Sequence, residues 1–242
     1  MAKIWLITSR ELSSYFNTWM GYIIVFAALL INGLLFNAFA IGDTPQYSAT
    51  VLENFFYYSS GIAMVAAIFL AIRLLAEEKQ TGTIVLFFTS PITERQIIYG
   101  KFASALIIFV ILQLISLYLP MLILVQGKIS PGHLVAGYLG VILLGASVLA
   151  ITLFASVVSP NQMIAGIVGS SITVTLLVLW IVANKVDDPF RDLLSYLAIH
   201  NLHFSPFSRG IVHTKDMIFY GSLAVFFLES SVRALESRRA QG

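Results

Sequence analysis

Residues 134–158 read LVAGYLGVILLGASVLAITLFASVV, a run without a charged side chain. An α-helix rises about 1.5 Å per residue and the hydrocarbon core of a bilayer is about 30 Å thick, so about 20 mostly apolar residues cross it. This run therefore predicts a membrane-spanning helix. Other stretches have the same character, and we expect six spans, over residues 21–41, 56–76, 102–125, 134–158, 163–183 and 217–235. Pro120, inside the third span, predicts a kink there.

The amino-acid composition is that of a membrane protein. Of 242 residues, 58% are hydrophobic and 11% are charged, whereas a soluble domain has about 45–50% apolar and about 25% charged residues. The net charge of +2 comes from few charges and says nothing about nucleic acid, and no nucleic-acid partner is expected for this membrane protein. The chain has no cysteine, which excludes disulfides and thiolate metal sites. We expect an all-α polytopic membrane protein with one transmembrane domain over residues 1–242.

Residues 1–20 precede the first span and carry no signal-peptide cleavage pattern. As a helix, this segment places Trp5, Leu12, Phe16 and Trp19 along one side. Such an apolar side is typical of a helix that lies in the membrane interface. We expect an amphipathic elbow helix that leads into the first span.

The basic residues indicate which side of the membrane each loop faces. Lys and Arg are enriched in cytoplasmic loops. If the N-terminus is inside, nine of the 14 Lys and Arg residues fall on the inner side and five on the outer side. The sequence therefore predicts that both termini are cytoplasmic.

Two connections are too long to be simple turns, an inner one over residues 77–101 and an outer one over residues 184–216. The inner one reads EEKQTGTIVLFFTSPITERQIIYGK. Thr93 followed by Glu94 is a suitable cap for the third spanning helix. Residues 83–89 predict a short helix across the membrane face, ended by Pro91, which disfavours helical geometry at Ser90.

This inner loop resembles that of ABC-2-type transporter permeases, in which the segment after the second span forms the coupling helix. The resemblance is carried by Glu78-Lys79, Gly82-Thr83, Leu86, Thr89-Ser90-Pro91 and Gly100-Lys101. A second resemblance is at the far end, where FSRGIVHTKDMIFYGSLAVFFLESSVRALESRR is similar to the last span and tail of the gliding-motility and copper-enzyme-maturation (nitrous oxide reductase maturation) permeases of that superfamily.

The resemblance implies the membrane subunit of an ATP-binding cassette exporter in the bacterial inner membrane. Such a subunit has no ATPase of its own, and Gly100-Lys101 is followed by Phe102 and lacks the pattern of a phosphate-binding loop. The implied partners are two copies of a cytoplasmic ATP-binding subunit, which would hold ATP and Mg²⁺, a second permease subunit, identical or related, membrane lipids, and a periplasmic or accessory membrane protein. No cofactor, metal site or catalytic residue is expected in this chain.

A coupling segment must transmit force through a packed contact whose register is fixed by charge pairs. The residues that we expect to couple to the ATP-binding subunit are Glu77, Glu78, Lys79, Gly82, Thr83, Leu86, Phe87, Ser90, Pro91 and Arg95. The alternative is an ordinary amphipathic loop that rests on the lipid headgroups.

Two ionisable residues lie about one turn inside the inner ends of their spans, Arg73 in the second and Glu229 in the sixth. Charges at membrane depth are costly unless they are paired or hydrated. One hypothesis is an ion pair between Arg73 and Glu229. The other is that Arg73 reaches lipid phosphates while Glu229 faces water.

The outer loop predicts re-entrant or interfacial helices, including an amphipathic one over residues 190–199, and the resemblance implies that such helices shape an exit gate. The expected gate residues are Phe190, Leu194, Leu197, His200, His203 and Phe204. Histidines three apart can share a metal, but no Cys or Met joins them at a suitable spacing, so no metal site is assigned.

Other functions fit the sequence less well. An intramembrane hydrolase would need Ser170 or Ser171 beside His200 or His203, and the sequence has no matching motif. A passive channel or secondary transporter would favour charged linings or broken helices near the midplane, and the sequence indicates neither.

Overall fold

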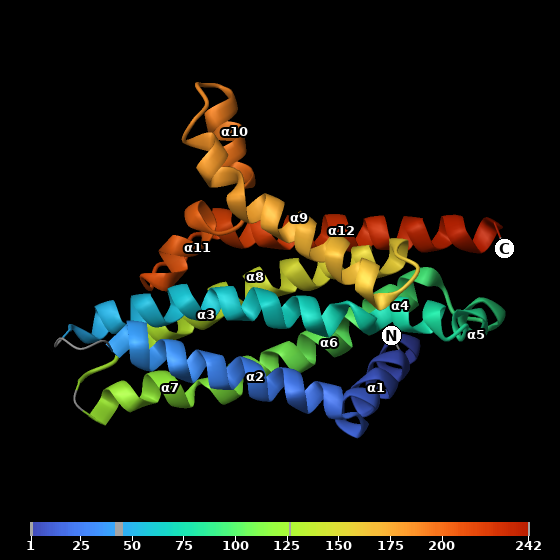
Figure 1. Ribbon diagram of the computed structural model, residues 1–242, viewed down its shortest axis with the longest axis horizontal. Helices are drawn as coiled ribbons and strands as arrows, with labels where there is room; N and C mark the ends of the chain where they lie inside the picture. The colour runs from blue at the N-terminus through green and yellow to red at the C-terminus, as the bar shows by residue number, and fades with distance from the viewer. Residues whose placement is uncertain (1, 42–45, 126, 242) are drawn as a thin grey trace.

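The computed structural model describes residues 2–41, 46–125 and 127–241 and is built of helices (Figure 1). Within those residues, six helices are long and apolar enough to cross a membrane, which confirms the predicted all-α polytopic fold and its number of spans. These spans cover Trp19–Ile41, Ser48–Gln80, Glu94–Val125, Pro131–Val158, Gln162–Ala183 and Thr214–Arg239.

Three of the spans are single α-helices and three are composed of shorter pieces. The single helices are α8 (Pro131–Val158), α9 (Gln162–Ala183) and α12 (Thr214–Gln241). The first span is α2 (Trp19–Leu35) followed by a π-helix (Phe36–Ile41), the second is α3 (Ser48–Ala71) with α4 (Arg73–Gln80), and the third is α6 (Glu94–Ser116), α7 (Tyr118–Met121) and a 3₁₀ turn (Leu122–Val125). Most of these spans extend beyond the predicted limits, because a helix need not end where its side chains become polar.

The α-helix of the third span is interrupted near Pro120. Proline has no amide proton, and its ring clashes with the carbonyl group four residues earlier. For Pro120 that carbonyl belongs to Ser116, and α6 ends at Ser116. The predicted effect of Pro120 is therefore confirmed, as a break in the α-helix followed by a 3₁₀ turn.

Helix α8 lies at the centre of the bundle and packs against α3, α6, α9, α11 (Asn201–Ser208) and α12. At three of its glycines, a phenylalanine side chain from another helix packs directly on the backbone of α8. A Cβ atom added at Gly137, Gly140 or Gly145 would lie within 2.4 Å of Phe56, Phe207 or Phe109, respectively, which is closer than real Cβ atoms approach. Glycine at these positions therefore allows α3, α11 and α6 to pack closely on the central helix.

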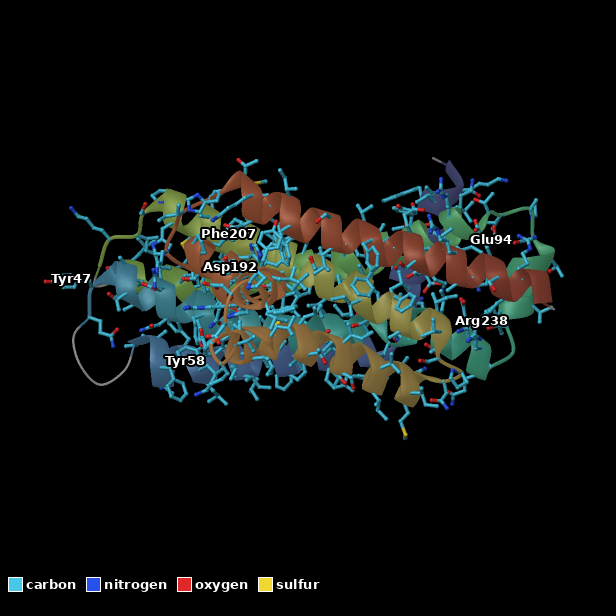
Figure 2. All side chains as sticks on the ribbon, turned by 90° about the horizontal axis from the view of Figure 1, so that it is seen from above. Tyr47, Tyr58, Glu94, Asp192, Phe207 and Arg238 are labelled. Carbon is cyan, nitrogen blue, oxygen red and sulfur yellow. The ribbon has the colours of Figure 1, made fainter. Side chains whose placement is uncertain are left out.

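The two ends of the bundle carry different short helices. At one end, here called the α5 end, lie α1 (Ala2–Asn17), α4, α5 (Ile84–Thr89) and the end of α12 (Figure 1). Tyr47 marks the opposite end, here called the α11 end, while Glu94 and Arg238 lie toward the α5 end (Figure 2). Both ends of the described chain therefore lie on the same side of the bundle.

The connection between α4 and α6 has the predicted cap and short helix. The amide N of Gln96 donates to Thr93 Oγ1 at 3.4 Å, and the amide N of Thr93 donates to Gln96 Oε1 at 3.3 Å, which completes a capping box. Gly82 has a φ of +74°, a conformation that favours glycine, and it turns the chain from α4 into α5.

The connection between α9 and α12 contains two helices, and the sequence predicts bounds for only the first of them. Helix α10 covers Phe190–Leu197, the chain is extended at Ala198, and α11 begins at Asn201. Ala198 and Ile199 are fully buried, and the amide of Ile199 donates to the carbonyl of Leu176 on α9. This contact with α9 ends α10 two residues before the predicted limit. In Figure 1, α10 projects from the bundle and α11 lies along it.

Candidate functional site

A buried ionic cluster joins three helices at the α5 end. Lys101, on α6, is 1% exposed. Its ammonium nitrogen lies 2.9 Å from Glu11 Oε1 on α1 and 2.8 Å from Glu78 Oε1 on α4. The second carboxylate oxygen of Glu78 has no partner among the described residues. A buried ammonium group needs such partners, since an unpaired charge away from water is strongly unfavourable.

Phe87 of α5 covers this Lys101 cluster, which consists of Lys101, Glu11 and Glu78. The Phe87 side chain is buried, and the centroid of its ring lies 5.3 Å from Lys101 Nζ. The guanidinium carbon of Arg10 lies 5.9 Å from the same ring. Cations within about 6 Å of an aromatic centroid are attracted by the ring. Helix α5 is therefore attached to the bundle through Phe87.

A second contact joins α4 to the end of α8. Lys79 Nζ donates to the backbone carbonyls of Ser156 at 3.1 Å and Ser159 at 2.9 Å, and also to that of Val157. The last carbonyl groups of a helix have no partner within the helix, and a cation there is favourable. Lys79 thus satisfies the end of α8 and is not free to pair with another protein.

The hydroxyl of Ser156 lies inside the break between α3 and α4. It accepts from the amides of Leu75 at 3.0 Å and Ala76 at 2.8 Å, and it donates to the carbonyl of Ile72 at 2.9 Å. A side chain inserted into the i to i−4 ladder is a known cause of helix breaks. The break after Ala71 is therefore held by a side chain of α8.

The hypothesis of an ion pair between Arg73 and Glu229 is wrong, because each residue has a different partner. Arg73 Nε lies 3.3 Å from Glu77 Oε2, and its guanidinium group packs over the ring of Tyr15 on α1. Glu229 accepts from Arg95 Nη2 at 3.0 Å and from Tyr99 Oη at 2.9 Å, both near the start of α6. Arg73 faces α1 while Glu229 on α12 faces α6, so the two side chains do not meet.

The residues that were predicted to couple to an ATP-binding subunit therefore fall into two groups, one buried in the protein and one exposed. Glu78, Lys79 and Phe87 point into the protein, where they form the contacts above. Ser90 donates to the carbonyl of Phe87 at 2.8 Å and so supports the end of α5. The members that remain exposed are Gly82, Thr83, Leu86, Pro91 and Arg95, while Glu77 is about half exposed. Val85 is 58% exposed beside Leu86 at 64%, and sequence reasoning did not single it out.

The sequence of the central part of the chain matches a known family. Residues 34–202 match the family described as ABC-2 family transporter protein. The chain belongs to this family. The match includes α4 and α5, but it leaves out α1 and α12. No curated protein matches the sequence.

Family membership makes the chain the membrane subunit of an ABC transporter, a multi-pass permease that is a transport component and not itself catalytic. It also implies an ATP-binding partner subunit and, as is usual in the family, a second permease. Glu78, Lys101 and α5 lie within the matched region, whereas Glu11, the third member of the Lys101 cluster, lies before it.

At the α11 end of the permease, the predicted gate residues also include both exposed and buried side chains. On α10, Phe190 and Leu197 are exposed and Leu194 is partly buried. In contrast, His200, His203 and Phe204 are buried against the bundle. His203 lies 2.7 Å from Asp216 Oδ1 and donates to the carbonyl of Tyr196 at 2.8 Å, and Phe219 stacks on its ring. These contacts hold α11 against the start of α12, and Asp216 is a partner that sequence reasoning missed.

His200 does not activate a serine. Its Nε2 lies 2.7 Å from Ser60 Oγ, but the Ser60 hydroxyl donates its proton to the carbonyl of Tyr57 at 2.6 Å. The ring nitrogen is therefore the donor to Ser60, whereas a general base must accept the serine proton. Ser170 donates to the carbonyl of Ile167 in its own helix. Among the described residues, no group of three or more His, Asp and Glu is placed to hold a metal ion.

The burial of His200 predicts a pH-dependent stability. Burial lowers the pKa of His200 because the charged ring is poorly solvated. The stability that the neutral, buried His200 ring contributes is fully present above the unfolded pKa of about 6.5. It is lost as the pH falls from there through the lower pKa of the folded state. We expect the Tm in detergent to fall more between pH 7.5 and pH 5 in the unmodified permease than in His200→Gln, which can still donate to Ser60. Equal falls in the two proteins would contradict this.

Proposed function

We propose that this chain is the permease subunit of an ATP-driven exporter in the bacterial inner membrane, with both termini in the cytoplasm. In this proposal the α5 end faces the cytoplasm, and residues 1–242 form one ABC-2 transmembrane domain. The ATP-binding subunit, in two copies, holds ATP and Mg²⁺, and this chain has no enzyme activity. The similarity of residues 207–239 to gliding-motility and copper-enzyme-maturation permeases supports a place in that subgroup.

The observation that carries the proposal is the arrangement of α5. Its exposed side presents Val85 and Leu86 at the end of the bundle, while its buried side attaches Phe87 to the Lys101 cluster. Exposed apolar side chains on a supported helix are suited to fill a groove on a partner protein. Motion of α5 would then reach α1, α4 and α6 through Glu11, Glu78 and Lys101.

Leu86→Asp is expected to reduce capture of the ATP-binding subunit. Loss of a central apolar contact at an interface costs about 2 kcal/mol or more, which is a decrease of about 30-fold in affinity. The measurement is the amount of ATP-binding subunit that co-purifies with the tagged permease, together with the ATPase activity of the preparation. Val212→Asp, at the exposed Val212 of the α11 end, is the matched control.

Equal capture by Leu86→Asp and the unmodified permease would overturn the assignment of α5 as the docking helix. Transport by the purified permease without any ATP-binding subunit would instead support a passive channel or secondary transporter. Labelling of single cysteines introduced at exposed Thr83 and Val212 in intact cells tests the orientation, because only the second should react from outside.

A further inference from the structure

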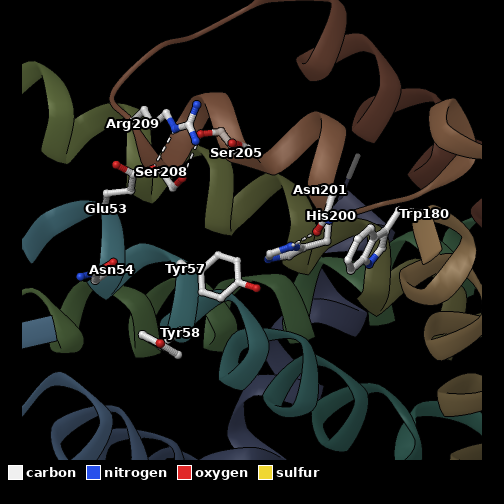
Figure 3. Close-up of a pocket in the computed structure, with 10 residues that line it drawn as sticks. All are labelled: Glu53, Asn54, Tyr57, Tyr58, Trp180, His200, Asn201, Ser205, Ser208 and Arg209. Atoms are coloured by element: carbon white, nitrogen blue, oxygen red, sulfur yellow. Dashed lines mark hydrogen bonds and ion pairs between the residues drawn. The ribbon is translucent and has the colours of Figure 1, made fainter. Parts of the chain in front are cut away.

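A cavity of about 430 Å³ lies at the α11 end, between α3, α9 and α11 (Figure 3). Sites for small molecules have volumes of about 300–1,000 Å³. The lining combines aromatic, amide and hydroxyl side chains with one acid and one guanidinium group. Its residues are Glu53, Asn54, Tyr57, Tyr58, Trp180, His200, Asn201, Ser205, Ser208 and Arg209. The coupling function proposed above uses none of them.

The charges of the cavity are already paired with one another. Arg209 Nε lies 2.8 Å from Glu53 Oε1, so the guanidinium group and the carboxylate of the lining are paired with each other (Figure 3). The remaining titratable group that is buried there is His200, and burial lowers the pKa of its ring, which favours the neutral form. A charged ligand would have to displace Glu53 or Arg209 from its partner, whereas a neutral ligand would not.

Several neutral hydrogen-bonding groups of the lining have no hydrogen-bond partner in the part of the chain that the structure describes. Among the described residues, no hydrogen bond is made by the hydroxyls of Tyr57 and Ser205, the indole nitrogen of Trp180 or the amide nitrogen of Asn201. The side-chain oxygen of Asn201, in contrast, lies 3.4 Å from His200 Nδ1. The cavity thus offers donors and acceptors that a ligand rich in hydroxyl groups can use.

Two aromatic rings provide apolar surfaces next to those polar groups. Tyr57 is 53% exposed and Trp180 is 36% exposed. In Figure 3, Tyr57 lies in the middle of the cavity, and Trp180 and His200 lie on one side of it. Rings that combine a flat apolar face with a polar edge suit a ligand that has both C–H surfaces and hydroxyl groups.

The cavity is lined by residues near the ends of two membrane-spanning helices, where lipid headgroups are expected. Trp180 is in the last turn of α9, and Glu53 is in the second turn of α3, so both are near the ends of membrane-spanning helices. Tyr and Trp are generally enriched at this depth, where they face lipid. Here, however, the cavity that they border is also lined by His200 and Ser208, which are buried in the protein.

We propose that this cavity binds a neutral polyhydroxylated ligand, a sugar that is either free or the headgroup of a glycolipid. The paired charges disfavour an ionic ligand, the unpartnered donors match hydroxyl groups, and the two rings match the C–H faces of a pyranose. This inference goes beyond the proposed function, since binding requires neither ATP nor the ATP-binding subunit.

Trp180 makes the binding measurable with this chain alone. The chain has three tryptophans, and the other two, Trp5 in α1 and Trp19 at the start of α2, are exposed and lie at the α5 end. In a Trp5→Phe/Trp19→Phe background, the fluorescence of Trp180 is followed in three conditions. These are maltose added in detergent, phosphatidylcholine nanodiscs with monoglucosyl-diacylglycerol, and phosphatidylcholine nanodiscs alone.

We expect a saturable change in Trp180 fluorescence with maltose, with the glycolipid, or with both, and none with phosphatidylcholine alone. A change with both probes assigns a free-sugar site, and a change with the glycolipid alone assigns a headgroup site. Asn201→Ala and Ser205→Ala are each expected to weaken binding about 10-fold, as the loss of one hydrogen bond costs about 1.4 kcal/mol. Asn17→Ala, at an exposed amide of α1, should have no effect.

Three results would overturn the proposal. One is the absence of a change with either sugar probe. Another is an equal change in phosphatidylcholine nanodiscs alone, which would show ordinary aromatic residues in contact with lipid. The third is unaltered binding by both Asn201→Ala and Ser205→Ala in proteins that keep the Tm of the background. Failure of Leu86→Asp to reduce capture of the ATP-binding subunit would leave this assay unaffected, so the two proposals fail separately.

Discussion

Lys101→Met lowers the free energy of unfolding of the permease by about 3–5 kcal/mol, as is usual when one partner of a buried ion pair is removed. The substitution keeps the apolar stem of Lys101 but leaves the carboxylates of Glu11 and Glu78 facing each other without a cation. The measurement is chemical or thermal unfolding in detergent. Because both acids also hold neighbouring helices, α1 and α4 should become more accessible to protease.

Two further variants separate the charge effect from a packing effect. Lys101→Met combined with Glu11→Gln and Glu78→Gln removes all three charges and is expected to recover much of the loss, since an uncharged set has no unpaired ion. Lys3→Met, which removes an exposed lysine that donates to the carbonyl of Pro91, should cost about 1 kcal/mol or less. A Lys101→Met variant as stable as the unmodified permease would show that the cluster contributes nothing.

Ser156→Ala is expected to lower the free energy of unfolding by about 3 kcal/mol, a large effect for the loss of one oxygen atom. Three backbone groups depend on that hydroxyl, the buried amides of Leu75 and Ala76 and the partly buried carbonyl of Ile72. Leaving a buried polar group unsatisfied costs about 1–3 kcal/mol. Hydrogen exchange at Leu75 and Ala76 should also become faster, which locates the effect at the break between α3 and α4.

The matched control is Ser170→Ala on α9. Its hydroxyl donates only to the carbonyl of Ile167, within the same helix, so the change should be within about 0.5 kcal/mol of zero. If Ser156→Ala behaves like Ser170→Ala, the break is stabilised by the surrounding packing and the hydroxyl is not needed.

The spans and the cap at Thr93 were predictable because each depends on residues close in sequence. A long apolar run, a proline inside it, and a Thr three residues before Gln96 all act locally. The bounds of helix α11 were not predicted, because it is short and contains Pro206. What decides its position is the contact of Ile199 and Phe207 with other spans, which no local pattern contains.

The candidate site was predicted only in part, for a related physical reason. The predicted coupling residues included Glu78, Lys79 and Phe87, but not the residues that they contact. Lys101 contacts Glu78 and Phe87, and the carbonyl of Ser156 accepts from Lys79. Lys101 carried one available signal, since a lysine at the start of a membrane span needs a buried partner or access to water. The error over Arg73 and Glu229 arose because depth in the membrane does not specify which neighbour a helix face meets.

The phenylalanine rings seated on the glycines of α8 have a consequence for how the α11 end can change shape. Phe207 fills the space above Gly140, and Ser208 accepts a hydrogen bond from His133 on the same helix, so α11 moves with α8 as one rigid body. Helix α9 is by comparison lightly packed, with much of its surface exposed. An opening at this end would therefore be a hinged displacement of α9 and α10, with α11 as the stationary wall.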